Sequence, residues 1–414
     1  MLDAKFIKEN TEDVKAMLKK RGVDVDVDSF VTINDSRITL ITKIEALRAE
    51  RNAISKKHSP ENVARSKEIK QELKDLDTEY KDVEAKALEL QMAIPNMLHP
   101  DVPEGHLDED NVELKRVGDV PEFSFPVKDH ETLGKELGMF DIAKASEVCG
   151  AGFYYLTGDA VLLEFALVKY ALDALMAEGF IPMITPELVR KQYASSTGYL
   201  PKREEPDIYK IENEDLYLIA TAEIPLAAYH AKETLQENDL PKKYAGFSSC
   251  FRKEAGAHGK HKKGIFRVHQ FDKIEMFAFV KPEESMDMFH SVIAISEKLF
   301  QGLGIPYRVV SISSGDMNGP GHIKYDIEYW SPVDKEYREI TSGTNTTDYQ
   351  ARRLSARYKN AEGKTEFVHT VNNTGFAIGR TLIAIMENFQ NEDGTITIPE
   401  VLRQYVGKDV ITPL

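Results

Sequence analysis

Apolar residues recur every three or four positions along one long stretch of the chain. In its second half they stand at Ile69, Leu73, Leu76, Tyr80, Val83, Ala87, Leu90 and Ile94. In its first half the same rhythm runs through Leu40, Ile44, Leu47 and Ile54, interrupted by Arg51. This heptad spacing predicts two helices packed lengthwise on each other. Ser59 and Pro60 between them are typical of an N-cap and a first helical residue, so we expect an antiparallel coiled-coil hairpin over about residues 36–94.

The periodic pattern stops in a stretch rich in proline, which includes Pro95, Pro100 and Pro103. A polar, proline-rich segment without periodicity is typical of a linker. We therefore expect two domains, at about residues 1–100 and 101–414. Residues 1–35 would supply a short helix from Ile7 to Lys20 and a strand beside the base of the hairpin.

The remaining chain mixes helical and strand patterns. Residues 162–178 predict an amphipathic helix ended by Gly179. Apolar runs predict strands at 180–184, 216–219, 266–276 and 305–311, and residues 242–283 read as two strands joined by a polar loop, an antiparallel hairpin. We therefore expect an α+β fold, in which the helical hairpin precedes a domain built on a mostly antiparallel sheet with flanking helices.

Composition narrows the class of protein. The 414 residues include two cysteines, Cys149 and Cys250, and carry a net charge of −15. A disulfide framework is therefore not expected, and a cytoplasmic location fits best. The first residues have no apolar stretch typical of a secretory signal, and no run suggests a membrane span. The acidic balance excludes a surface uniformly basic for nucleic acid, although a local RNA-binding surface stays open.

Charged residues lie within the predicted strands of the second domain. Arg252 and Glu254 alternate with Phe251, so both would project from one face of a strand, and Arg267 and Glu275 would lie on the returning strand. Lysines 260, 262 and 263 lie in the loop between them. Arginines can grip phosphate with two parallel hydrogen bonds, and a glutamate can hold Mg²⁺, so the set suits a nucleoside triphosphate. For one isolated arginine, a salt bridge on a sheet face would be the better interpretation.

Several motifs resemble those of a known family. Phe251-Arg252-x-Glu254 with its loop and return strand resembles motif 2 of class II aminoacyl-tRNA synthetases (about 247–276), and Gly379-Arg380 entering a helix resembles motif 3 (about 374–403). The segment at about 162–186 resembles motif 1. Other signatures are similar to those of seryl-tRNA synthetases, namely Thr221-Ala222-Glu223, His269-Gln-Phe271-x-Lys273-x-Glu275, Glu339-Ile-Thr-Ser342, Asp348-Tyr-Gln-Ala-Arg-Arg353 and Pro399-Glu-Val-Leu402. The resemblance covers essentially the whole chain.

The resemblance implies an enzyme that activates L-serine with ATP to seryl-adenylate and transfers the seryl group to tRNA(Ser). Arg252, Glu339 and Arg380 would be the catalytic residues, and Glu339 and Ser342 would hold Mg²⁺. ATP would be bound by Arg252, Lys253, Glu254, Arg267, Val268, Phe271, Glu339, Ile340, Thr341, Ser342 and Arg380. Serine would be bound by Thr221, Ala222, Glu223, Arg252, Glu275 and Thr374.

The same resemblance implies that the hairpin binds tRNA and that motif 1 forms a homodimer. The basic residues near the predicted tip are Lys56, Lys57, Arg65, Lys67 and Lys70. Read without the resemblance, the hairpin is a solvated coiled coil of mixed charge. One position departs from the family pattern: Gly152 stands where the family usually has arginine. Two alternatives stay open: a relative that delivers the amino acid to a carrier protein, and a non-catalytic RNA-binding protein.

Overall fold

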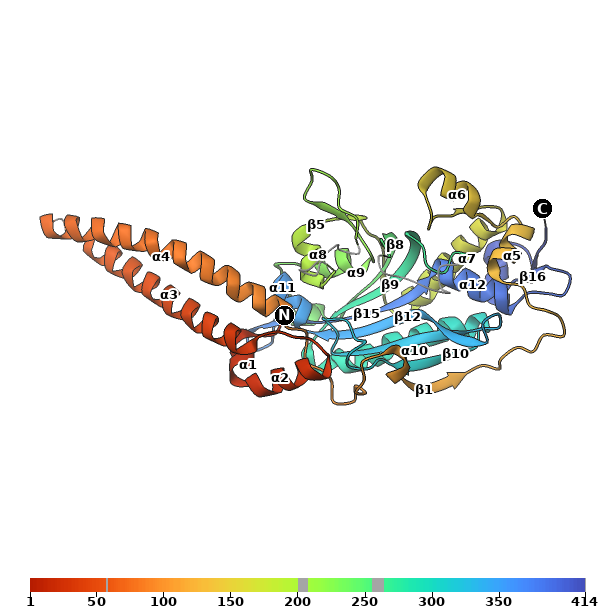
Figure 1. Cartoon of the computed structure of the whole chain (residues 1–414), viewed down its shortest axis with the longest axis horizontal. Coiled ribbons are helices and arrows are strands. Elements are labelled where there is room, and N and C mark those ends of the chain that lie inside the picture. The colour runs from red at the N-terminus through yellow and green to blue at the C-terminus, as the bar shows by residue number, and fades with distance from the viewer. Residues whose placement is uncertain (57–58, 200–207, 255–263, 414) are drawn as a thin grey trace. The chain divides into compact units, whose positions relative to one another are not determined.

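The computed structural model describes residues 1–56, 59–199, 208–254 and 264–413, and the chain divides into two compact units (Figure 1). The first unit is Met1–Met97 and the second is Leu98–Leu414. The first is coloured red to orange in Figure 1, and the second continues from orange to blue.

The described part of the first unit is built from four helices. They are α1 (Ala4–Glu9), α2 (Thr11–Lys20), α3 (Val27–Ile54) and α4 (Pro60–Ala93). The strand expected within residues 1–35 is therefore wrong, because α3 begins at Val27. The sequence around Val23, Val25 and Val27 is compatible with a strand. However, Asp26 caps the helix, because its side chain accepts a hydrogen bond from the Ser29 amide at 2.9 Å.

Helices α3 and α4 form the expected antiparallel hairpin (Figure 1). The Ser59 hydroxyl accepts a hydrogen bond from the Asn62 amide at 3.2 Å, and Pro60 is the first helical residue, as its position in the sequence indicates. The residues buried in the seam come from both helices: Ile44, Leu47, Ile69, Leu73 and Leu76. The heptad pattern is confirmed, since the buried positions are those that it selects.

The second unit is organised around one sheet, whose described residues give eight strands in the order β1-β10-β11-β12-β15-β9-β8-β4. In that order the strands are Val112–Val117, Tyr307–Ser311, Ile323–Ser331, Glu336–Thr347, His369–Ala377, Gln270–Val280, Lys242–Phe251 and Ile181–Ile184. Neighbours are antiparallel except β4 and β8, which are parallel. The mostly antiparallel sheet and the hairpin of β8 with β9 are confirmed.

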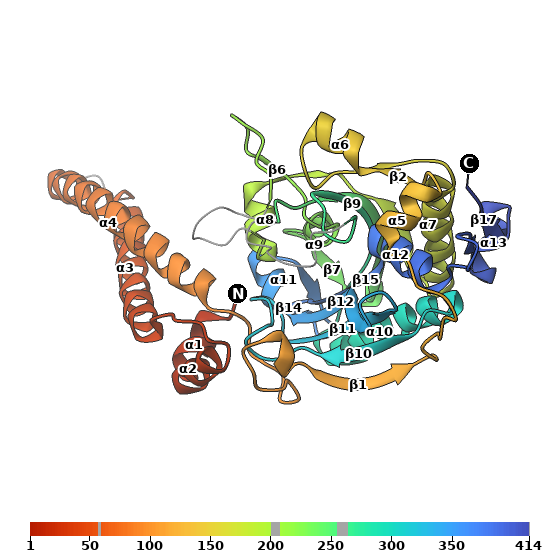
Figure 2. The same ribbon diagram turned by 45° about the vertical axis from the view of Figure 1, so that its right-hand side comes forward.

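Successive side chains of β9 point alternately into two apolar clusters on opposite faces of the sheet. Ile274 and Met276 join the larger core, to which α7 (Asp159–Ala177), α10 (Ser285–Leu303) and α12 (Ile378–Asn388) contribute. Phe277 and Phe279 join a second cluster with α9 (Glu223–Ala228) and α11 (Tyr349–Leu354). Since successive side chains point to opposite faces, helices flank both faces of the sheet. Figure 1 and Figure 2 show α10 alongside the strands that it contacts, β12 and β15.

Shorter elements complete the second unit. The helices are α5 (His130–Glu136), α6 (Ile142–Cys149), α8 (Lys191–Thr197) and α13 (Glu400–Val406). The strands are β2 (Phe140–Asp141), β3 (Tyr155–Leu156), β5 (Leu188–Arg190), β6 (Leu216–Leu218), β7 (Thr234–Gln236), β13 (Arg357–Lys359), β14 (Thr365–Phe367), β16 (Ile396–Thr397) and β17 (Val410–Ile411). Among the described residues, no helix combines the length and apolar character needed to span a membrane.

Candidate active site

A cavity of about 260 Å³ lies in the second unit. Its walls come from the chain beside β8 and from β9, β12, β15 and the start of α12. The sequence-predicted residues that line it are Glu223, Arg252, Glu254, Arg267, Val268, Phe271, Glu275, Glu339, Ile340, Thr341, Ser342, Thr374 and Arg380. Thr221 and Ala222 are fully buried and do not line it, and the Lys253 ammonium lies 5.9 Å from the centre of the Tyr209 ring. Lysines 260, 262 and 263 lie outside the described residues.

The backbone around Arg252 and Arg267 differs from the expected alternation on two strands. Strand β8 ends at Phe251 and β9 begins at Gln270, so Arg252, Glu254 and Arg267 belong to the connecting segments. The predicted strand positions of these three residues are wrong. Glu254 has a φ of +49°, which turns the chain away from the extended path. Its carboxylate nevertheless reaches the Arg267 guanidinium at 3.3 Å, so both side chains meet in the cavity.

Three guanidinium groups converge on the cavity. Arg252 donates to the Ala220 carbonyl at 3.3 Å, and its guanidinium carbon lies 5.2 Å from the centre of the Phe271 ring. Arg380 lies 4.6 Å from the centre of the Phe266 ring. The Nε of Arg267 is buried and has no hydrogen-bond partner among the residues that the structure describes. Because a guanidinium has five N–H donors, this set retains donors for an anion.

Glu339 stands beside Arg380, whose Nη1 lies 3.1 Å from its carboxylate and 3.1 Å from its carbonyl oxygen. Burial alone would raise the pKa of Glu339, but the charges of Arg380, Lys324 and Arg252 outweigh it and hold the pKa below its usual value. Ser342 faces Asp326 across β11 and β12, and the Oδ1 atom of Asp326 is buried with no hydrogen-bond partner in the described part of the chain. Carboxylate and hydroxyl oxygens are hard ligands, so this corner fits Mg²⁺.

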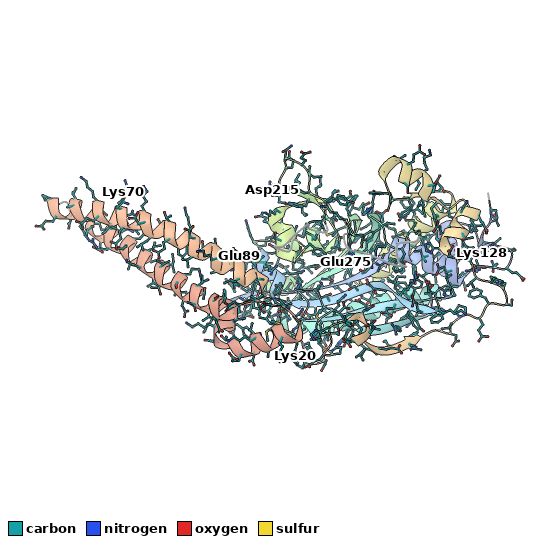
Figure 3. The ribbon with its side chains drawn as sticks, in the orientation of Figure 1. Lys20, Lys70, Glu89, Lys128, Asp215 and Glu275 are labelled. Carbon is teal, nitrogen blue, oxygen red and sulfur yellow. The ribbon has the colours of Figure 1, made fainter. Side chains whose placement is uncertain are left out.

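A second polar group lies deeper, around Glu275 (Figure 3). Its carboxylate, 2% exposed, pairs with Lys273 on the same face of β9. The Lys273 ammonium also donates to the Thr221 hydroxyl at 2.6 Å. Across the neighbouring strand, the Thr374 hydroxyl lies 3.5 Å from Glu275, its register partner. These groups form a small polar pocket at one side of the cavity.

Glu223 adds a second carboxylate to this pocket. Tyr199 donates to it at 2.8 Å, and the Gln350 amide donates at 2.7 Å. Burial raises the pKa of Glu223, and the negative charge of Glu275 raises it further. Two buried carboxylates beside one ammonium leave one negative charge that a second cation would balance, such as the ammonium group of a small ligand.

The comparisons with known proteins agree along the whole chain. Residues 1–98 match the family described as "Seryl-tRNA synthetase N-terminal domain", and residues 208–389 match "tRNA synthetase class II core domain (G, H, P, S and T)". The chain is 47% identical over 421 residues to the serine–tRNA ligase of Rubrobacter xylanophilus, covering 100% of this chain and 99% of that protein. The chain belongs to the seryl-tRNA synthetase family. The serine–tRNA ligase of Treponema denticola is 44% identical, over 99% of this chain and 100% of that one.

Solved structures of the seryl-tRNA synthetase family share this fold. The crystal structure of the seryl-tRNA synthetase from Pyrococcus horikoshii complexed with ATP superposes with a TM-score of 0.91 at 41% identity, and covers 100% of both chains. The serine–tRNA ligase from Naegleria fowleri in complex with AMP gives a TM-score of 0.87 at 36% identity, over 100% of this chain and 99% of that one.

Gly152, the departure named in the sequence analysis, lies directly against His269. It has a φ of +84°, and a Cβ built on it would come within 2.4 Å of the His269 ring. The Gly152 carbonyl accepts from the His269 amide at 2.8 Å, and the His269 Nδ1 lies 2.9 Å from the Arg252 carbonyl. His269 therefore occupies the space beside Gly152 and fixes the backbone at Arg252.

The predicted tRNA-binding residues of the hairpin differ in their surroundings. Arg65 pairs with Glu50 at 2.8 Å and with Glu68 at 3.3 Å, so neighbouring carboxylates partly neutralise it. Lys56 and Lys67 are exposed, and Lys70 projects from α4 (Figure 3). Lys57 lies outside the described residues.

A shallow groove along the hairpin gathers basic residues that the sequence analysis did not select. It is lined by Arg48, Arg51, Lys70, Leu73, Lys74, Asp77, Thr78 and Lys81. Arg48 pairs with Asp77 at 3.0 Å, whereas no carboxylate of the described residues pairs with Lys70, Lys74 or Lys81. This basic groove lies along the middle of the hairpin, and only Lys70 belongs to both sets.

Sequence reasoning also missed cavity residues, among them Tyr199, Phe266, Lys273 and Lys324. Lys273 stood inside a quoted motif, and its position two residues from Glu275 on a strand could have placed both on one face. Tyr199 and Lys324 come from distant segments, and no local pattern marks them.

Proposed function

We propose that this protein activates L-serine with ATP to give seryl-adenylate and diphosphate, and then transfers the seryl group to the 3′ end of tRNA(Ser). The observation that carries the proposal is one cavity in which Arg252, Arg267 and Arg380 adjoin the polar pocket around Glu275. A triphosphate and a small amino acid would thus meet within one site. Residues 101–414 would form the catalytic domain and residues 1–100 the tRNA-binding domain.

In this proposal the arginines bind the phosphates. Arg252 would hold the α-phosphate and the serine carboxylate, and Arg267 and Arg380 the tail phosphates. Glu254 would accept from the adenine amino group and Phe271 would stack on the ring. The full ATP-binding set is Arg252, Lys253, Glu254, Arg267, Val268, Phe271, Glu339, Ile340, Thr341, Ser342 and Arg380. The Nε of Arg267, which has no hydrogen-bond partner among the described residues, supports a role for Arg267 in phosphate binding.

Mg²⁺ would be held by Glu339 and Ser342 and would neutralise phosphate charge when bound. The lowered pKa of Glu339 keeps its carboxylate ionised, as a metal ligand requires. Arg380 is already within hydrogen-bond reach of the same carboxylate, so the metal ligand and the phosphate-binding arginine orient each other.

Serine would occupy the pocket of Thr221, Ala222, Glu223, Arg252, Glu275 and Thr374. Glu223 and Glu275 would receive its ammonium group, and Glu275 or Thr374 its hydroxyl. Alanine would leave one of these buried polar groups unpaired, and such a site can reject an analogue by roughly 10⁴-fold. Lys273 supports the pocket because it balances one of the two carboxylates.

The chemistry needs position and charge rather than a protein base. The serine carboxylate attacks the α-phosphorus and diphosphate leaves; a ribose hydroxyl of the tRNA then attacks the acyl carbon and AMP leaves. Holding the reacting groups in line can contribute about 7–11 kcal/mol. The arginines stabilise the charge that develops on the phosphate oxygens.

Three further parts of the proposal concern partners and location. The hairpin would bind the tRNA backbone, supported by the basic groove. A homodimer is supported by large apolar side chains left exposed on α7 and β4, including Phe165 at 64% and Ile184 at 84%. A cytoplasmic location is supported by the two unpaired cysteines.

The activation step is tested by ATP–diphosphate exchange with a panel of amino acids. Serine should support exchange, and alanine should not. Arg252→Ala should abolish it, while Arg403→Ala on α13, away from the cavity lining, serves as the matched control. Exchange that ignores serine, or that survives Arg252→Ala, would overturn the proposal.

A further inference from the structure

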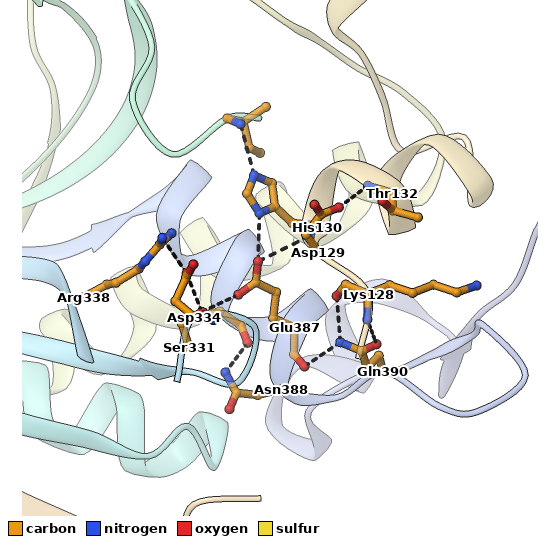
Figure 4. A network of polar contacts seen from close by, with 12 residues as sticks. Lys128, Asp129, His130, Thr132, Ser331, Asp334, Arg338, Glu387, Asn388 and Gln390 are labelled. Atoms are coloured by element: carbon orange, nitrogen blue, oxygen red, sulfur yellow. Dashed lines mark hydrogen bonds and ion pairs between the residues drawn. The ribbon is translucent and has the colours of Figure 1, made fainter. Parts of the chain in front are cut away.

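His130 is a buried histidine that none of the roles above uses. It is the first residue of α5, whose N-cap is Asp129, and it is 4% exposed. Figure 4 shows it at the centre of a polar network that joins α5 to the end of α12 and to the turn after β11. A buried polar ring with partners on several elements fixes those elements relative to one another.

The partners of the ring determine which nitrogen carries the proton. The Nδ1 atom lies 2.8 Å from an oxygen of Glu387, and the His130 amide donates to the same oxygen at 3.3 Å. The Nε2 atom lies 3.3 Å from the backbone nitrogen of Ile265, which can only donate. Nε2 is therefore the acceptor, and the proton sits on Nδ1, where it is donated to Glu387.

Glu387 is itself held in place. It lies on α12, 1% exposed, and its second oxygen is 3.0 Å from the Ser331 hydroxyl. Asp334 is also 3.0 Å from this hydroxyl and pairs with Arg338 (Figure 4). The imidazole therefore has little freedom to turn, and Nε2 is presented to Ile265 at a fixed place.

The segment that Nε2 holds leads directly into the cavity. Gly264 has a φ of +67°, and a Cβ there would come within 1.9 Å of Nε2, so the chain passes closely over the ring. The next residues, Phe266 and Arg267, both line the cavity. The Phe266 ring lies under two guanidinium groups, with Arg338 at 5.0 Å and Arg380 at 4.6 Å.

We propose that His130 is a positioning residue for the nucleotide: by accepting the Ile265 amide, it holds Phe266 and Arg267 at the wall of the cavity. The inference rests on the proposed binding of ATP there. It predicts that loss of the Nε2 acceptor weakens ATP binding and leaves unaffected the serine pocket, which includes Glu223 at the start of α9, Glu275 on β9 and Thr374 on β15.

Two substitutions separate the two nitrogens. In His130→Asn the amide can still donate to Glu387, but no atom reaches Ile265. In His130→Gln an oxygen takes the place of Nε2 and can accept from Ile265. We expect His130→Asn to raise the KM for ATP by about tenfold, the cost of one buried hydrogen bond, with the KM for serine unchanged. His130→Gln should restore the KM for ATP to within about threefold of the unmodified protein.

Amide hydrogen exchange of the full chain gives a readout independent of activity. Peptides covering residues 264–267 should exchange faster in His130→Asn than in the unmodified protein, and slowly again in His130→Gln. Ser331→Ala leaves His130 in place and removes the hydroxyl that Glu387 and Asp334 share, so it gives a milder perturbation in the same direction should the histidine variants not fold. Equal KM for ATP and equal exchange in all variants would overturn the inference. Absence of ATP binding in the unmodified protein would instead overturn the proposed function. The difference in amide hydrogen exchange between the variants is measured without ATP, so it tests the role of His130 separately.

Discussion

The ammonium of Lys273 lies 2.6 Å from the hydroxyl of Thr221 and at the same time pairs with Glu275. One cation thus ties β9 to the segment before α9 and balances a carboxylate that is 2% exposed. With Glu223 nearby, the pocket contains two buried carboxylates and one fixed ammonium. In the proposed function, the ammonium group of serine would be the second cation of this pocket.

Removal of the Lys273 charge is expected to damage serine binding. Lys273→Met leaves the buried carboxylate of Glu275 without its ion-pair partner, and breaking a buried pair of this kind costs about 3–5 kcal/mol. We expect the KM for serine in ATP–diphosphate exchange to rise at least about tenfold, with the KM for ATP changed little. A variant whose two KM values rise together would contradict the assignment of this pocket to serine.

Gly152 should not tolerate a side chain. In Gly152→Ala the new Cβ would meet the His269 ring, and the φ of +84° adds backbone strain of about 1–2 kcal/mol. Since His269 fixes the Arg252 carbonyl, the displacement should reach Arg252 and lower kcat for exchange. Gly150→Ala is the comparison, because it has a similar φ of +92° but open space around its Cβ. Equal kcat in the two variants would show that the contact with His269 does not matter.

The basic groove of the hairpin should act only in the tRNA step. Replacing Lys70 and Lys74 together by Glu should raise the KM for tRNA by on the order of tenfold and make its salt dependence shallower, since two phosphate contacts are lost. Serine-dependent exchange should not change. Lys86→Glu, on the same helix outside the groove, is the control, and it is compared with Lys70→Glu alone so that the charge changes are equal. An equal loss in the control would mean that overall charge, not the groove, governs binding.

Stability should fall in mild acid because of His369. Burial lowers the pKa of this imidazole to about 4, whereas in the unfolded chain it is about 6.5. Between these values the unfolded chain binds a proton that the folded chain does not, so stability is lost as the pH falls from about 6.5 towards 4. His369→Gln removes this contribution, so the Tm of the variant should depend less on pH between about 6.5 and 4. An unchanged slope would show that other groups control it.

The sequence predicted best where one local pattern decides the structure. The heptad of Leu73 and Leu76 fixed the hairpin, because burial of a helical seam depends only on spacing. The strands β12 and β15 show no alternation of apolar and polar residues in the sequence, because they bury polar residues such as Asn345 and Asn373. Motif residues pointed to the cavity, but the pairing of Lys273 with Thr221 and of His130 with Ile265 joins segments far apart in sequence. Such contacts arise only when the sheet and helices assemble.

Aminoacylation measures both proposed steps, serine activation and transfer to tRNA, in one experiment. The protein is incubated with labelled serine, ATP, Mg²⁺ and tRNA(Ser), and label attached to the tRNA is measured over time. We expect ATP-dependent formation of seryl-tRNA that is absent with Arg252→Ala and reduced when Lys70 and Lys74 are both replaced by Glu. Serine-dependent exchange without any label on tRNA would contradict it and would point to a different acceptor.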